Sequence, residues 1–303
     1  MRRWSMSWVV FFGVAAGVHG QEPWTPFSEP HVRVVNSVAF SPTGDEMYLA
    51  LLYPDFLRDS AAAESAPATA MFRSTRTPEG WSAPEQMDFS GVYQDYEPTV
   101  SADGRLMVFN SRRPGIDGQI PSTNDLWWSE RGSDGGWSAP RRIDALSTLE
   151  QEESYATLAA DGTLVYLAGR PGADGVVGFD LMVSRFEGGA FTPATVHPVS
   201  RNEWGEGDPW IAHDGSYLIF TRWDPDREWR ETVDLYVSFS RDGSWSEPEP
   251  LTRLNTAGPD YGAAVSADGQ WLYYRANGRF MRVELSEALE GRAYDASGQE
   301  RSR

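Results

Sequence analysis

An aromatic residue followed by Ser or Thr and then by a proline recurs along the chain at a nearly constant interval. The phrase occurs at Trp24 (WTP), Trp81 and Trp137 (both WSAP), Phe191 (FTP) and Trp245 (WSEP), with spacings of 57, 56, 54 and 54 residues. An interval of this length is typical of β-propellers and other stacked arrays, in which each repeat is one small structural unit. The repeat therefore limits the fold to an array of similar sheets.

A short turn motif recurs in the same phase as the aromatic phrase. It is SPTG at 41–44, SADG at 101–104, AADG at 159–162, AHDG at 212–215 and SADG at 266–269. An Asp-Gly pair between apolar runs is typical of a tight β-hairpin. Two β-rich runs follow each turn, and in four of the five units the aromatic phrase comes next. Each unit is thus predicted to be a sheet of four antiparallel strands.

The count of strands predicts how the array is closed. The first three strands occur five times, but no aromatic-Ser-x-Pro phrase follows Met281, and the spare copy lies at Trp24. If the spare strand pairs with the last sheet, the sheets form a closed ring without edges that template aggregation. The sequence therefore predicts an all-β fold over residues 21–290, a five-bladed β-propeller closed by its N-terminal strand. The five aromatic residues are predicted to pack between blades.

The N-terminus has the pattern of an exported protein. Arg2 and Arg3 precede an apolar run of 11 residues, WVVFFGVAAGV, which is too short to span a bilayer and leads to small residues ending at Gly20. Residues 1–20 are therefore expected to be a cleaved signal peptide, and the mature chain is expected to be periplasmic or secreted. An uncleaved membrane anchor is the alternative. Residues 291–303, rich in charged and small side chains, are expected to form a disordered tail.

Cysteine content and charge exclude several classes of function. The chain of 303 residues has no cysteine, which excludes disulfides and thiol catalysis. Its formal net charge of −18 repels phosphate backbones, so no nucleic-acid partner is expected, whereas basic partners and metal cations are compatible with it. Because no second long apolar run follows the first, no membrane span is expected in the mature chain. We expect the mature protein to be a monomer.

The segments SADG, SRRPG, NDLWWSERG and GWSAP, with an apolar strand after the turn, together resemble the WD40-like, or PD40, repeat. That repeat builds the propeller domain of the TolB family and related periplasmic proteins. The resemblance covers roughly residues 22–285 and is strongest in the second to fourth units. It implies an exported propeller scaffold. TolB-like proteins usually have six blades and a small N-terminal domain, whereas this sequence predicts five blades.

Acidic residues recur nine positions before the glycine of the turn in four units, and two further acids follow two residues later. In a propeller the innermost strand lines a central channel, so these acids are predicted to lie at its mouth. That mouth is on the face with the longer loops, where binding sites of propellers are expected. The candidate ligand-binding residues are Asp95, Glu97, Glu153, Glu206, Asp208 and Asp260.

Three explanations fit these acids. They cap backbone amides where each blade begins, they bind a cation such as Ca²⁺ or a basic partner, or two of them form a catalytic pair. Hydrolysis of a glycoside needs two carboxylates about 5 to 9.5 Å apart. No cofactor is expected beyond such a cation. The leading hypothesis is a non-enzymatic scaffold that binds a protein, a peptide or a glycan, and the alternative is a carbohydrate-active hydrolase.

Three units also share an Asp at the start of the third strand and an Arg at the end of the second. We expect Asp–Arg or Asp–backbone contacts that hold the loop between these strands, as structural interactions worth about 0–1 kcal/mol each. The residues are Asp125, Asp180 and Asp234, and Arg112, Arg170 and Arg222.

Overall fold

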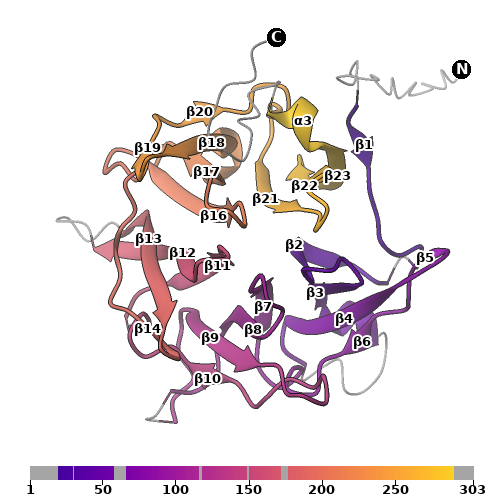
Figure 1. Ribbon diagram of the computed structural model, residues 1–303. Helices are drawn as coiled ribbons and strands as arrows, with labels where there is room; N and C mark the ends of the chain where they lie inside the picture. The colour runs from indigo at the N-terminus through magenta and orange to yellow at the C-terminus, as the bar shows by residue number, and fades with distance from the viewer. Residues whose placement is uncertain are drawn as a thin grey trace, which may run out of the picture.

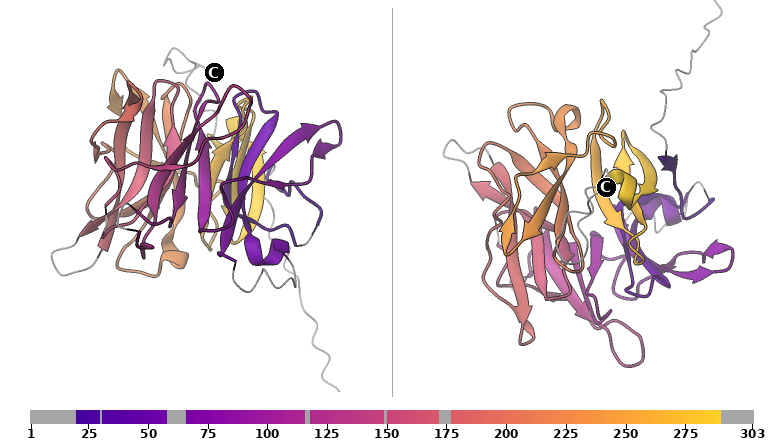
Figure 2. Two further views of the ribbon diagram at one scale, coloured as in Figure 1. Left: turned by 90° about the horizontal axis from the view of Figure 1, so that it is seen from below. Right: turned by 45° about the horizontal axis from the view of Figure 1, so that its top comes forward.

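The computed structural model describes residues 20–289, except 30, 58–65, 116–117, 149 and 172–176. Five antiparallel sheets surround a central channel (Figure 1), and Figure 2 shows the same sheets side by side around the channel axis. The fold is therefore the predicted five-bladed β-propeller. Of the expected signal peptide only Gly20 is described, and the expected tail lies outside the described residues.

The first three blades follow one another along the chain, each with its innermost strand first. Blade 1 contains β2 (Val34–Phe40), β3 (Glu46–Leu52), α1 (Tyr53–Leu57), β4 (Thr69–Thr77), β5 (Gly80–Trp81) and β6 (Glu85–Gln86). Blade 2 contains β7 (Asp95–Val100), β8 (Leu106–Ser111), β9 (Asp125–Glu130) and β10 (Arg141–Arg142). Blade 3 contains β11 (Glu153–Leu158), β12 (Thr163–Pro171), β13 (Val177–Glu187), β14 (Ala190–Phe191) and β15 (Thr195–Val196).

The last two blades have the same order, but blade 5 borrows its outer strand from the start of the chain. Blade 4 contains β16 (Gly205–Ile211), β17 (Tyr217–Trp223), α2 (Trp229–Thr232), β18 (Asp234–Arg241), β19 (Ser244–Trp245) and β20 (Glu249–Pro250). Blade 5 contains β21 (Asp260–Val265), β22 (Trp271–Ala276), β23 (Arg279–Glu284) and β1 (Glu22–Pro23), and α3 (Leu285–Ala288) follows β23.

Strand β1 closes the ring, as the strand count predicts. It pairs antiparallel with β23, so that Glu22 lies opposite Arg282 and Pro23 opposite Met281. The side chains support the pairing, because Arg282 Nε donates a hydrogen bond of 2.5 Å to Glu22 Oε1. A proline suits this outer strand, since the solvent side of an edge needs no backbone donor.

The expected alignment of Trp24 with the other aromatic residues is wrong. The Trp24 amide donates to the carbonyl of Phe280 in the third strand, at 2.9 Å. In the other blades, the residue whose amide makes the equivalent bond to the third strand lies six positions after the aromatic residue of the phrase. These residues are Met87, Ile143, His197 and Leu251. Trp24 is therefore equivalent to these four residues and not to the aromatic residues of the other blades. The backbone hydrogen bond to Phe280 fixes this register. The matching aromatic position would precede Gly20, outside the described residues.

Three of the remaining aromatic residues pack against the preceding blade, as predicted. The rings of Trp137 and Tyr48 are 5.8 Å apart, those of Phe191 and Trp128 are 6.0 Å apart, and those of Trp245 and His197 are 4.8 Å apart. Trp81 contacts Phe40 of its own blade, within the apolar cluster that joins blades 1 and 5. Trp24 belongs to this same cluster.

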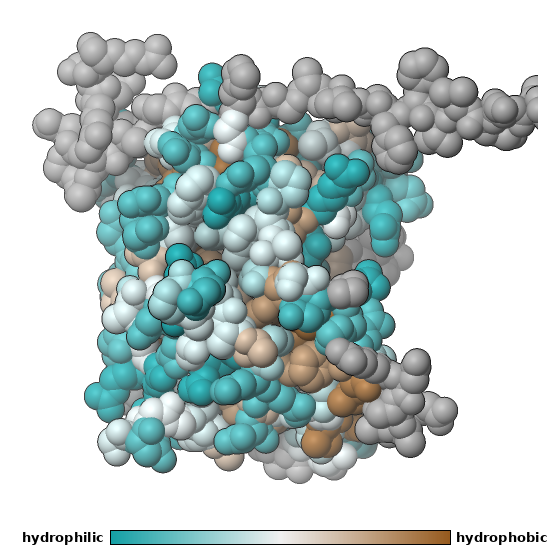
Figure 3. Space-filling model, turned by 90° about the vertical axis from the view of Figure 1, so that its right-hand side faces the viewer, coloured by the Kyte–Doolittle hydropathy of each residue, from teal (hydrophilic) through white to brown (hydrophobic). Residues whose placement is uncertain are grey.

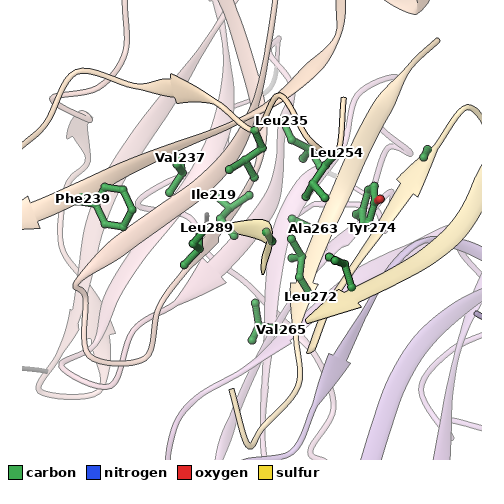
Figure 4. Close-up of a cluster of buried hydrophobic side chains, with 14 residues drawn as sticks. Ile219, Leu235, Val237, Phe239, Leu254, Ala263, Val265, Leu272, Tyr274 and Leu289 are labelled. Atoms are coloured by element: carbon green, nitrogen blue, oxygen red, sulfur yellow. The ribbon is translucent and has the colours of Figure 1, made fainter. Parts of the chain in front are cut away.

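Helix α3 completes the junction between blades 4 and 5. Ala288 and Leu289 are buried there, in one cluster with Ile219 and Phe239 of blade 4 and Leu272 of blade 5 (Figure 4). No aromatic residue of a described outer strand packs at this junction. The turn after β23 supplies the apolar side chains there instead.

The Ser or Thr of the aromatic phrase joins the broken outer strand to its neighbour. In four blades a serine of the third strand donates a hydrogen bond of 2.6–2.7 Å to the carbonyl of that residue. The hydroxyl of the same residue accepts a backbone N–H in return, at 3.0–3.1 Å. The donors are Ser74, Ser129, Ser184 and Ser238, and the acceptors are Ser82, Ser138, Thr192 and Ser246.

The outer surface near β1 and β5 is mainly hydrophilic, with a smaller apolar area at one corner (Figure 3). Within the described part of the chain, no helix is long and apolar enough to span a bilayer.

Candidate functional site

Each innermost strand contains a β-bulge whose first residue has a left-handed backbone. The register of all five strands shifts at this point, and the φ angles are between 42° and 68°. Bulges of this kind bend a strand and turn a side chain away from the regular alternation. We call the five equivalent residues the bulge ring: Asn36, Glu97, Tyr155, Asp208 and Gly262.

Hydrogen bonds between a side chain and a neighbouring backbone join adjacent blades at all five junctions, close to the bulge ring. These bonds keep the inner strands in contact around the channel. They run from Ser37 N–H to Glu97 (3.3 Å), Tyr155 N–H to Asn110 (2.9 Å), Ile211 N–H to Thr157 (3.2 Å), Gly262 N–H to Asp208, and Arg275 to Asn36 O (3.0 Å).

Two of the predicted acids are buried in ion pairs within their own blades. Asp95 is fully buried and accepts from Arg113 Nη1 at 2.5 Å, and Ser111 Oγ donates to it at 2.6 Å. Glu206 is also fully buried and accepts from Arg222 Nη2 at 2.9 Å. Each carboxylate also accepts from a serine of the loop that enters its blade, Ser90 for Asp95 and Ser200 for Glu206.

Two more of the predicted acids hold the loop that enters their blade. Glu153 accepts from the N–H and the hydroxyl of Thr148, both at 2.9 Å. Asp260 accepts from the N–H of Thr256 at 2.5 Å. Burial raises the pKa of Glu153 to about 7 and that of Asp260 to about 6. These contacts fit the capping explanation, and a ligand-binding role for these four acids stays a prediction.

The structure does bring Glu97 and Asp208 to one place, at the bulge ring. Both line the channel cavity of about 350 Å³, Glu97 from blade 2 and Asp208 from blade 4. Burial raises the pKa of Glu97. Burial first, and then the charge of Glu97, raises the pKa of Asp208 to about 8. The neutral carboxyl is therefore the favoured form of Asp208 below that pH.

A second cavity, of about 620 Å³, opens on the long-loop face and shares Tyr155 and Asp208 with the channel. We call it the aromatic pocket. Besides Tyr155, its walls include Phe179, Trp223 and Trp229, which come from blades 3 and 4 and from α2. The rings of Phe179 and Trp223 lie 6.0 Å apart. The pocket lies on the face that the loop lengths favour for binding.

Two glycines in β16 make room for this pocket. A side chain at Gly205 would collide with the indole of Trp223, its cross-strand partner. A Cβ atom at Gly207 would lie 2.7 Å from Leu167 Cδ1. The GEGDP segment thus lets Trp223 lie against the strand backbone.

Three carboxyl groups line the aromatic pocket, those of Glu150, Glu152 and Asp208. Glu152 accepts from the backbone N–H of Asn124 at 3.0 Å and from its side-chain amide at 2.5 Å. No arginine or lysine is among the described residues that line the pocket. Thr123 Oγ1, a buried atom in the pocket wall, has no hydrogen-bond partner among the described residues. The lining is therefore aromatic and acidic.

The predicted Asp–Arg contacts occur in one of three blades. Arg170 pairs with Asp180 in blade 3 as expected. In blade 2, Asp125 pairs instead with Arg142 at 2.8 Å, because β10 brings that arginine beside the start of β9. In blade 4, Arg222 turns to the buried Glu206.

Sequence reasoning missed the aromatic pocket. Phe179, Trp223 and Trp229 do not recur in phase, so the repeat gave no reason to group them. The available signal was the segment WDPDREW at 223–229, which has an indole at each end of a long loop.

No cluster of three or more potential metal-ligating side chains occurs within the described residues. A cation at the channel mouth stays a prediction.

Fold and site together define a five-bladed β-propeller with a pocket on its long-loop face. No protein-family model matches the chain, and no curated protein sequence matches it. A protein of unknown function from Dyadobacter fermentans is similar in structure, with a TM-score of 0.53 and 13% identity, covering 92% of this chain and 86% of that one.

Two enzymes are more distant in structure. Prolyl oligopeptidase B from Galerina marginata has a TM-score of 0.46 and 9% identity, over 80% of this chain but only 30% of its own length. A gluconolactonase from Xanthomonas campestris has a TM-score of 0.47 and 12% identity, over 84% of this chain and 86% of its own. At these identities the likeness concerns the fold alone.

Proposed function

We propose that this protein is an exported PD40/TolB-like propeller that serves as a non-enzymatic binding scaffold, active as a monomer. Its ligand is a protein, a peptide or a glycan, and it binds in the aromatic pocket between blades 3 and 4. The observation that carries the proposal is the pocket itself, in which aromatic side chains from two blades surround a cavity on the long-loop face. Aromatic walls with a few polar groups are typical of binding sites.

The repeated acids support a scaffold over an enzyme. Asp95, Glu153, Glu206 and Asp260 each bind partners in their own blade or entry loop. Each of these acids is thus engaged with its own blade or entry loop and not with another acid of the set.

Affinity capture tests the proposal. Residues 21–303 serve as bait in an extract of the exported compartment, beside Trp229→Ala as the pocket variant and Trp271→Ala as the matched control outside the pocket. We expect one species that the wild type and the control retain and that Trp229→Ala loses. Equal capture by all three baits would contradict binding in this pocket.

A hydrolase is the second candidate, because Asp208 and Glu152 offer two carboxyls to one pocket. The raised pKa of Asp208, about 8, suits a general acid at neutral pH. A screen on aryl glycosides and polysaccharides distinguishes the candidates. Turnover that Asp208→Asn abolishes, with folding unchanged, would replace the scaffold by an enzyme.

A further inference from the structure

We propose that the aromatic pocket binds an ammonium group, such as the side chain of a lysine on a partner peptide or protein. This inference rests on the proposed function, because it uses the same site. It goes further by naming the charge and the chemistry of the group that enters the pocket.

The walls provide the first argument. The faces of Trp223 and Trp229 carry negative quadrupole charge, as do those of Phe179 and Tyr155. A cation within about 6 Å of such a face is attracted to it, and indole is the strongest partner. An ammonium group with an alkyl stem also leaves its methylene groups against the apolar walls.

The charges provide the second argument. Three carboxyl groups line the pocket, and that of Asp208 gains its charge as the pH rises through about 8. The hydrogen bonds to Glu152 and Asp208 come from Asn124 and from the Gly262 backbone. These uncharged donors leave the negative charge in place, since the salt bridges found within the described residues include neither acid. All 26 basic residues of the chain are arginines, and none lines the described part of the pocket.

The same charges argue against other ligands. An anionic sugar, such as a uronic acid, would be repelled by the carboxylates of the pocket, to which Asp208 adds its charge above about pH 8, and by the net charge of −18. A neutral sugar can stack on an indole but gains no attraction from the charge. A cation is attracted both by the aromatic faces and by the negative charge. It is therefore the class of ligand that the lining of the pocket favours.

The position of Asp208 links binding to pH. The titratable groups around it are Glu97 from β7, whose charge raises the pKa of Asp208, and Tyr155 from β11 and Tyr261 from β21, whose own pKa values Asp208 raises. Because the pKa of Asp208 is about 8, its charge grows as the pH rises through that value. A bound cation favours the ionised form, so its affinity should rise between pH 6 and pH 9.

The first test uses two probes that differ in the charge at Nε, which an acetyl group removes. Nα-acetyl-lysine methylamide carries one ammonium group, and its Nε-acetylated twin carries none. Calorimetry at pH 8.5 and low salt should show binding of the charged probe and at least tenfold weaker binding of the neutral twin. Equal affinity for both probes, or no binding of the charged one, would overturn the inference.

Variants locate the binding. Asp208→Asn keeps the shape of the side chain and suits the left-handed backbone, where φ is 42°. We expect Asp208→Asn and Trp229→Ala each to weaken the charged probe at least tenfold, which is about 1.4 kcal/mol. Asp208→Asn should also remove the rise with pH. The exposed control Glu187→Gln should bind like the wild type, and unchanged affinity in both pocket variants would refute the assignment.

The absence of lysine permits a second test. A carbodiimide joins a carboxylate to an amine, and this chain has no side-chain amine to compete with the probe. With equimolar charged probe, mass spectrometry should find the probe on Glu150, Glu152 or Asp208 ahead of other acids. Even labelling across exposed acids would refute the site. If capture depends on Trp229 while both probes bind equally, only this inference fails and the scaffold stands.

Discussion

Buried carboxyls are the residues whose chemistry the fold changes most. The folded-state pKa is about 7 for Glu153, about 8 for Asp208 and about 6 for Asp260, in each case raised mainly by burial. Above pH 4 the native chain therefore holds more protons than the unfolded chain at these sites. At these sites stability consequently falls as the pH rises. His197, whose pKa burial lowers to about 4, acts in the opposite sense between about pH 4 and pH 6.5. Acids with lowered pKa values, such as Asp103 and Asp161, act in the opposite sense only below about pH 4.

We predict that the free energy of unfolding decreases from pH 6.5 to pH 8.5, where the raised carboxyls titrate and His197 is neutral in both states. Each unit by which a folded-state pKa exceeds its ordinary value costs about 1.4 kcal/mol once the group is ionised. Asp208→Asn should flatten the profile, because an amide cannot be ionised. Urea unfolding at several pH values measures this, with Glu187→Gln as the exposed control. A wild-type profile that is flat, or that rises, would contradict the assigned pKa directions.

The broken outer strand is the element that the repeated phrase builds. Its aromatic residue packs across to the previous blade, and its Ser or Thr exchanges hydrogen bonds with the third strand. The phrase thus serves packing and pairing together, which explains why it recurs in phase.

Removing one of these hydroxyl groups should weaken a single blade. Ser238 is fully buried and donates to the Ser246 carbonyl at 2.7 Å. Ser238→Ala leaves that carbonyl without its donor and should cost about 1–2 kcal/mol. Ser240→Ala, two residues on, is the matched control and should cost less than about 0.5 kcal/mol. Thermal and urea unfolding measure the loss of stability in each variant. Equal losses in Ser238→Ala and Ser240→Ala would count against a role of Ser238 in pairing the outer strand.

At the scale of the whole molecule, one short strand holds the ring shut. The ring of Trp24 lies 4.4 Å from that of Tyr273 and 4.9 Å from that of Phe280. Without β1, the edge of β23 would be exposed to other chains.

We therefore predict that a chain starting at Thr25 loses at least about 3 kcal/mol of stability, because an aromatic contact and an edge strand are lost. It should also self-associate in size-exclusion chromatography. A synthetic peptide of residues 20–29 should restore the monomer by adding the missing strand. The same peptide with Trp24→Ala should not restore it. A truncated chain as stable as the full one would show that β1 does not close the ring.

The sequence was sufficient for the fold because turns and strands recur visibly. Five Asp-Gly-type turns fix the number of blades, and the strand count fixes the partner of the last blade. Periodicity alone does not determine the register, so Trp24 was assigned to the wrong outer-strand position. It also cannot group residues that break the repeat, such as Phe179, Trp223 and Trp229. Of the acids, Glu97 and Asp208 meet because bulges turn both toward the channel, and no sequence pattern marks those bulges.

The pairing of β1 with β23 joins residues 260 positions apart. A ribosome releases Glu22 long before Arg282, so the earliest strand must wait unpaired while four blades assemble. Contacts this distant along a chain form slowly. The ring therefore closes only after β23 has been made, and until then the edge that β1 covers stays exposed.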